Sequence, residues 1–261
     1  MSIVNIEDIY IGSRNLEFKK ISFKNVTFSY DTKKTNLNKI NLSVSKGETV
    51  AIVGPSGAGK TTIISLLERF YDIDSGEIFI DDESIQSISL DYLRSNIGYV
   101  SQKYPIVTGT IRDNLLYGLV NKNISDQHLY NISKFTNFYE VLDRLPDKLD
   151  SKVGEKGILL SEGEKQRLVL TRIFLIDPPI LLLDEITSSI DSYSEKVVQE
   201  SIEKINRDKL VIIVAHRLST IQNADKIIFI ENGNITGVGT HLELLENHEL
   251  YTKFIEYQIQ K

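Results

Sequence analysis

The sequence contains no cysteine and no tryptophan, and only one methionine and five prolines among its 261 residues. Without cysteine, the chain forms neither disulfides nor thiolate metal sites, which suits a reducing compartment. Long apolar runs are also missing, since the strongest, such as ILLL at 180–183, are far shorter than a bilayer span. Residues 1–15 lack both the basic start and the apolar run of a signal peptide. We therefore expect no direct membrane insertion by this chain.

The sequence also lacks a cluster of basic residues. Its 30 Lys and Arg stand against 36 Asp and Glu, for a net charge of −6, and no run of them forms the stripe that duplex nucleic acid requires. We therefore expect no nucleic-acid partner. A hydrophobic content of 41% over 261 residues is enough for a large core. The sequence predicts a single folded domain over residues 1–261, with lobes around that core.

Three apolar runs have the composition of strands that are covered on both faces: 49–53, 180–184 and 210–215. Such strands, with helices between them, are typical of a parallel sheet with helices on both sides. Residues 21–30 and 40–44 instead alternate apolar and polar positions, as half-buried antiparallel strands do. The sequence therefore predicts an α/β fold with a mostly parallel sheet and an N-terminal antiparallel β layer.

A different pattern fills the middle of the chain. Between about residues 103 and 176 the segments are helix-like, including 111–118 and 125–135, so we predict an inserted α-helical subdomain there. Asn-Gly within 227–239 separates two apolar runs and predicts a hairpin. Residues 241–258 are predicted to form short helices.

The stretch GPSGAGKTT, from Gly54 to Thr62, has the spacing of a phosphate-binding P-loop. It lies between a covered strand and a helical pattern, which is the context that this motif requires. Its glycines let consecutive N–H groups surround a phosphate at the start of a helix. Lys60 is expected to neutralise the β- and γ-phosphates, and Thr61 to offer its hydroxyl to Mg²⁺. We therefore predict a P-loop NTPase core.

Two carboxylates stand at the end of the covered strand 180–184. We expect this strand to lie beside the P-loop strand, so that Asp184 at its tip reaches the hydrated magnesium ion. Glu185 comes next and could act as the general base on the attacking water.

Residues 159–167, LLSEGEKQR, have two explanations. Ser161 and Glu164 fit the reciprocal capping box of an ordinary helix start. The same small and polar residues would also suit a surface that meets a phosphate. This stretch alone leaves both open.

In order and spacing, these motifs resemble the nucleotide-binding domain of ABC transporters, from about residue 16 onward. The resemblance implies that Tyr30 stacks on adenine and that Gln102 is the Q-loop glutamine. Asp191 ends SSID, which is similar to the D-loop, and His216 in AHRLS resembles the switch histidine that touches the γ-phosphate. LSEGE at 160–164 falls where the family carries its LSGGQ signature, which faces the ATP held by the other subunit.

The resemblance implies ATP and Mg²⁺ as ligands. The catalytic residues that it implies are Glu185, His216, Gln102 and Lys60. The metal ligands would be Thr61, Gln102 and Asp184. The nucleotide contacts would be Tyr30, Gly54, Pro55, Ser56, Gly57, Ala58, Gly59, Lys60, Thr61, Thr62, Gln102, Ser161, Gly163 and Asp191.

Taken singly, some of these residues have a structural alternative. Tyr30 suits a strand end packed on the core, and Asp191 suits a helix N-cap. Gln102 could be a plain loop residue, and His216 a partly buried imidazole with satisfied hydrogen bonds. Their order and spacing together favour the nucleotide-binding roles.

Two segments narrow the resemblance to exporters. SKVGEKG at 151–157 is similar to the exporter segment TEVGERG, which contacts the membrane domains, and TGTIRDNLLYG at 108–118 is similar to the exporter stretch FxGTIRENI. The implied partners are a second nucleotide-binding domain and the transmembrane domains of an exporter, at the cytoplasmic face of the cell membrane. The main alternative is a soluble ABC ATPase that is not coupled to transport, such as an assembly factor.

The signature departs from the family pattern, because Glu162 replaces its first glycine and Glu164 its glutamine, whereas Ser161 and Gly163 remain. A carboxylate near a triphosphate weakens a closed dimer unless Glu162 faces solvent or Lys165 screens it. Our hypothesis is that the chain hydrolyses ATP at its own P-loop when a partner supplies a regular signature, and that LSEGE completes a weaker site. A homodimer that hydrolyses ATP at ordinary rates, unchanged by Glu162→Gly, would contradict it.

Overall fold

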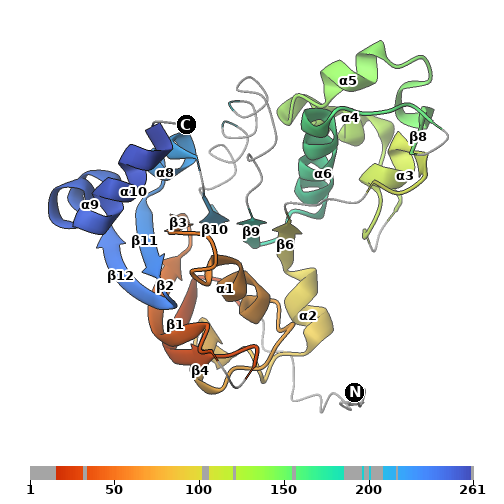
Figure 1. The fold of residues 1–261 in the computed structure, drawn as a ribbon. Helices are drawn as coiled ribbons and strands as arrows, with labels where there is room; N and C mark the ends of the chain where they lie inside the picture. The colour runs from red at the N-terminus through yellow and green to blue at the C-terminus, as the bar shows by residue number, and fades with distance from the viewer. Residues whose placement is uncertain are drawn as a thin grey trace.

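The structure, a computed structural model, describes residues 16–31, 34–101, 106–119, 122–154, 157–184, 196, 200, 208–215 and 217–259. At its centre lies a sheet with the strand order β12-β11-β3-β10-β9-β6 (Figure 1). The strands are β3 Thr49–Val53, β6 Ile97–Val100, β9 Ile180–Asp184, β10 Leu210–Val214, β11 Lys226–Glu231 and β12 Asn234–Gly239. Strands β3, β6, β9, β10 and β11 pair in parallel, whereas β12 is antiparallel to β11. This confirms the mostly parallel sheet.

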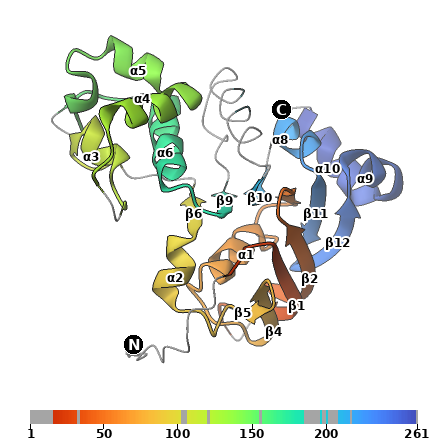
Figure 2. The ribbon, with the colours of Figure 1, turned by 180° about the vertical axis from the view of Figure 1, so that it is seen from behind.

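A second, antiparallel sheet has the order β2-β1-β4-β5. Its strands are β1 Lys20–Phe28, β2 Leu37–Ser45, β4 Ser75–Ile80 and β5 Glu83–Ser84. The antiparallel N-terminal layer is thereby confirmed, although β4 and β5 lie beyond the segments that the sequence predicted. Both views show helix α1, Lys60–Leu67, between this layer and the central sheet (Figures 1 and 2).

The central sheet is buried on both faces because its side chains alternate between two cores. Val50 and Ile52 of β3 face the core that includes α1 and the antiparallel layer. Ala51 and Val53 face the other core, which is formed with α6, Glu162–Ile176, and the C-terminal helices. This explains why the covered strands have almost no polar residues.

A group of helical elements gathers beside the sheet, around α6 (Figure 2). They are α3 Ile111–Leu115, α4 Asp126–Phe135, α5 Tyr139–Arg144 and the 3-10 turn η1 Lys148–Asp150. These elements fall within the range 103–176 that the sequence predicts to be a helical insertion. No helix in the described part of the chain is both long and apolar enough to span a bilayer.

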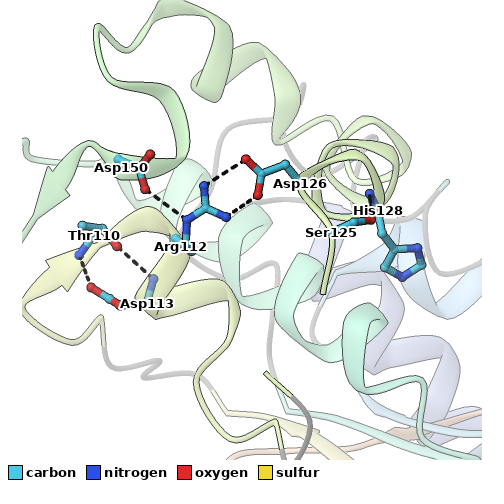
Figure 3. Close-up of polar contacts among 7 residues, drawn as sticks. All are labelled: Thr110, Arg112, Asp113, Ser125, Asp126, His128 and Asp150. Atoms are coloured by element: carbon cyan, nitrogen blue, oxygen red, sulfur yellow. Dashed lines mark hydrogen bonds and ion pairs between the residues drawn. The ribbon is translucent and has the colours of Figure 1, made fainter. Parts of the chain in front are cut away.

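Arg112 joins three elements of this helical group (Figure 3). Its guanidinium makes a two-pronged ion pair with Asp126 of α4 and donates from Nε to Asp150 of η1 at 3.0 Å. These bonds raise the pKa of Arg112 above its ordinary value. Thr110 and Ser125 cap α3 and α4, so the helix starts beside Arg112 are fixed as well.

The C-terminal part matches its prediction closely. Asn232 and Gly233 connect β11 and β12 with φ values of 48° and 75°, which is the left-handed geometry of a tight hairpin turn. The short helices α8 Leu218–Gln222, α9 His241–Asn247 and α10 Glu249–Ile259 complete the described chain.

Candidate nucleotide-binding site

The P-loop leaves the end of β3 and passes directly into α1. At Gly54 an added Cβ would lie 2.0 Å from the carbonyl oxygen of Ile230, and at Gly59 it would lie 2.9 Å from that of Asn36. Gly59 also has a φ of 107°. Both positions therefore require glycine, because no side chain fits. The glycines let the loop backbone pass close to Ile230 and Asn36, as a loop that surrounds a phosphate with its N–H groups requires.

Lys60 is the first residue of α1 and is only 5% exposed. Its Nζ donates to the carbonyl oxygens of Gly54 and Pro55, both at 2.9 Å. The cation is thus held against the inside of the loop. The start of α1 has no side-chain cap and no acidic residue in its first turn, so its first N–H groups are suited to an anionic ligand.

Thr61 and Asp184 meet at the same end of the sheet. The Thr61 hydroxyl lies 3.3 Å from Oδ1 of Asp184, which ends β9 and is 6% exposed. A hydroxyl and a carboxylate at this spacing fit Mg²⁺, which is usually held by one or two protein groups together with phosphate and water. No group of three or more His, Cys, Asp or Glu residues that could hold a metal occurs in the described ranges.

The position of β9 corrects one expectation. It is not the immediate neighbour of the P-loop strand, because β10 lies between β9 and β3. The carboxylate still reaches Thr61, because the first turn of α1 lies close to the end of β9.

Tyr99 of β6 is a neighbour of Asp184 that the sequence did not indicate. Its hydroxyl donates to the Asp184 carboxylate, and burial, followed by the charges of Asp184 and Glu68, raises the pKa of Tyr99 to about 12. The phenol therefore stays protonated at neutral pH and keeps Asp184 in place.

Glu68, at the end of α1, is a buried carboxyl near this site. Burial raises its pKa to about 7, although the charge of Arg94 opposes the shift. Among the described residues no group donates to its Oε2. A folded-state pKa above the unfolded value means that its contribution to stability is complete below pH about 4.5 and is lost as the pH rises through about 7.

We expect Glu68→Gln, which cannot ionise, to lose less stability than the wild-type chain between pH 5 and pH 8. The expected difference in the free energy of unfolding is about 1–3 kcal/mol at pH 8, measured by urea denaturation at several pH values. Glu77→Gln, at an exposed position of β4, is the matched control. Equal pH slopes for the wild-type chain and both variants would show that Glu68 ionises freely in the fold.

Tyr30 has the environment of a base-stacking residue. Its ring lies edge-on to Phe28 at 4.8 Å and to Tyr71 at 5.0 Å between centroids. Its hydroxyl also bonds to Oγ1 of Thr62 at 3.2 Å. The ring is therefore held in one orientation while the residue stays 49% exposed. An oriented aromatic surface beside the P-loop suits a nucleobase.

The capping box at the start of α6 is confirmed. The Ser161 hydroxyl accepts from the Glu164 N–H, and the Glu164 carboxylate accepts from the Ser161 N–H. Glu162 is exposed at the surface, and Lys165 donates to its Oε1 at 2.6 Å. Glu162 therefore meets both conditions under which its charge would not weaken a closed dimer: it faces solvent, and Lys165 screens it. Gly163 is buried within the first turn.

The structure does not bring all the predicted site residues together. Ser161 caps α6 and Gly163 lies in its first turn, in the helical group, whereas the P-loop connects β3 to α1 beside the central sheet (Figure 1). The predicted residues Gln102, Glu185, Asp191 and His216 lie outside the described residues.

The two segments that resemble exporter sequences pair with each other. Strand β7, Gly109–Thr110, is antiparallel to β8, Lys152–Val153. The Ile111 N–H, at the start of α3, also donates to the Ser151 carbonyl at 3.0 Å. Residues 42 and 44 positions apart in the sequence, Thr110 with Lys152 and Gly109 with Val153, thus pair in one surface at the edge of the helical group.

Comparison with known proteins agrees with this geometry. A family model described as ABC transporter matches residues 37–188. The chain is 45% identical over 247 residues to a multidrug resistance ABC transporter ATP-binding and permease protein of Lactococcus lactis, covering 95% of this chain and 42% of that protein. It is 44% identical over 247 residues to an ABC-type transporter of Aspergillus fumigatus, covering 94% and 19%. The chain spans less than half the length of these relatives.

The fold is also similar to a solved one. The structure of a bacterial Atm1-family ABC exporter with ATP bound superposes with a TM-score of 0.87 and 36% sequence identity, over 94% of this chain and 43% of that chain. The chain belongs to the ABC transporter family, as a nucleotide-binding domain of the exporter type.

Proposed function

We propose that this chain hydrolyses ATP and that the hydrolysis powers export across a membrane. Members of its family bind and hydrolyse ATP. The observation that carries the proposal for this chain is the convergence of Lys60, Thr61 and Asp184 where the P-loop enters α1. These residues supply a cation for the phosphates and two oxygen ligands for a metal.

Each site residue would have its own role in binding or hydrolysis. Tyr30 would hold adenine, the P-loop N–H groups and Lys60 would bind the phosphates, and Thr61, Asp184 and Gln102 would hold Mg²⁺. The ion would neutralise charge on the phosphate oxygens. Glu185 would accept a proton from the attacking water, and His216 would contact the γ-phosphate.

A complete site needs two chains. Because Ser161 and Gly163 lie on a different element from the P-loop, we propose that the signature of one domain and the P-loop of another enclose each ATP, with Asp191 at the contact. ATP would hold the dimer closed, whereas ADP and phosphate would release it. The driving force is the difference in affinity of the closed dimer for ATP and for its products.

We further propose that the paired β7–β8 surface and the region of Gln102 contact the transmembrane domains of an exporter at the cytoplasmic face of the membrane. The name of the Lactococcus lactis relative, which combines ATP-binding and permease parts, supports a transmembrane partner. Export as a whole would then depend on domains outside these 261 residues.

A phosphate-release assay tests the proposal. The purified chain is incubated with ATP and Mg²⁺, alone and with the transmembrane partner in lipid. We expect release of phosphate that the partner stimulates. A chain that releases no phosphate under either condition, although it binds ATP, would be a nucleotide-binding module only.

A further inference from the structure

The signature turn carries two carboxylates where its family pattern has none, and each has its own cation. Glu162 pairs with Lys165 of the same helix. Glu164 pairs instead with Arg144, the last residue of α5, whose Nη2 donates to Glu164 Oε1 at 2.5 Å. The second pair therefore joins two elements rather than two turns of one helix.

The two oxygens of Glu164 have different partners. Oε2 accepts from the Ser161 N–H at 2.9 Å and completes the capping box, while Oε1 accepts from Arg144. The Glu164 side chain is only 11% exposed, whereas Arg144 is 56% exposed. A carboxylate that is this well buried is costly to leave without a cation, because both its charge and its lone pairs lose water.

A second ion pair between α5 and α6 supports the contact of Arg144 with Glu164. At the other end of α5, Glu140 pairs with Arg167 of α6 at 3.5 Å, and the Arg167 side chain is 9% exposed. Arg167 also reaches the carbonyl oxygen of Asn137, just before α5. Two ion pairs, one near each end of α5, therefore fix this short helix along the first turns of α6.

We propose that Arg144 is a positioning residue for the signature turn: it neutralises Glu164 and holds it in the capping box, so that Ser161 and Gly163 keep the geometry needed to face a triphosphate. That the turn faces a triphosphate rests on the proposed function. It explains how this chain carries a glutamate at position 164 near a nucleotide.

The pairing also predicts that the identities of residues 144 and 164 depend on each other. Glutamine at position 164 could still cap the helix through its carbonyl oxygen, but its NH₂ group would then point at the Arg144 guanidinium, donor against donor. If Arg144 is absent, glutamine meets no such conflict. Glutamate and arginine fit together, and glutamine fits without arginine.

The test is a double-mutant cycle of the wild-type chain, Arg144→Ala, Glu164→Gln and the double variant. Hydrogen exchange of the Ser161 and Glu164 amides in the nucleotide-free chain reports the turn itself. The affinity of ATP-dependent dimerisation, measured in a Glu185→Gln background, reports whether the turn is placed to face the ATP of the other chain. We expect Arg144→Ala to accelerate the exchange and weaken the dimer roughly tenfold, as losing a half-exposed charge partner does. The double variant should return to within about twofold of the wild type.

Two controls separate positioning from general destabilisation. Lys148→Ala removes the exposed Lys148–Asp143 pair, at 3.0 Å in the same part of the chain, and should leave both readouts unchanged. The affinity of each monomeric variant for a fluorescent ATP analogue should also stay unchanged, because Arg144 does not belong to the P-loop.

The possible results distinguish the role of Arg144 from the proposed function. If Arg144→Ala behaves like Lys148→Ala, or if Glu164→Gln fails to rescue it, Arg144 does not position the turn. If the wild-type chain never dimerises with ATP while the exchange pattern follows the cycle, the proposed function fails and the role of Arg144 stands. If the chain dimerises with ATP but no difference in hydrogen exchange follows the cycle, the proposed function stands and the role of Arg144 fails.

Discussion

Replacing Lys60 with alanine is expected to weaken nucleotide binding severely. The ammonium group is buried and held by the carbonyl oxygens of Gly54 and Pro55, so it is already placed where the loop receives phosphate. Alanine removes this cation and its hydrogen bonds together. We expect a loss of about 2–5 kcal/mol of binding free energy, which is roughly 30-fold to several-thousand-fold in affinity. Isothermal titration calorimetry with ATP and Mg²⁺ measures it.

Lys46→Ala is the matched control, because Lys46 is an exposed lysine in the turn between β2 and β3. It removes the same charge from the chain without touching the P-loop. Circular dichroism should show that both variants are folded. An affinity of Lys60→Ala equal to that of Lys46→Ala would mean that Lys60 does not contact the phosphates.

The second large effect is expected from Glu185→Gln. Glu185 directly follows Asp184 at the end of β9, and we propose it as the general base. Glutamine keeps the size and the hydrogen-bonding oxygen but cannot accept the proton from water. We expect turnover to fall by about 10²–10⁴-fold while ATP still binds, so that the closed dimer accumulates. Phosphate release and size-exclusion chromatography with ATP measure the two effects.

Glu231→Gln provides the comparison, since Glu231 also ends a strand of the central sheet, β11. It should leave turnover and the monomer–dimer balance unchanged. A Glu185→Gln chain that stays monomeric and keeps full activity would contradict both the role of Glu185 and the dimer mechanism.

The parts of the fold that the sequence predicted are those with strong local signals. β3, β9 and β10 are almost purely apolar, and Asn232-Gly233 is a specific turn sequence, so each was recognisable alone. β6 and α2, Leu90–Ser95, have only four and six residues and mixed composition, and neither was predicted. The insertion of β10 between β3 and β9 could not be predicted, because strand order depends on contacts between distant segments.

The same distinction holds for the candidate site. Lys60, Thr61 and Asp184 belong to short motifs whose spacing carries their chemistry, and the structure brings them together. Tyr99 and Arg144 act through residues 85 and 20 positions away, Asp184 and Glu164. No local pattern marks them, since any tyrosine in a strand or arginine at a helix end looks the same in sequence.

The Arg112 junction has a mechanical consequence. Because one guanidinium fastens α4 and η1 to α3, and η1 leads into β8, these ion pairs resist bending between the β7–β8 edge and the helices behind it. Arg172 of α6 donates to the carbonyl oxygen of Asn114 in α3 at 2.8 Å, so a force on that edge is passed on to α6.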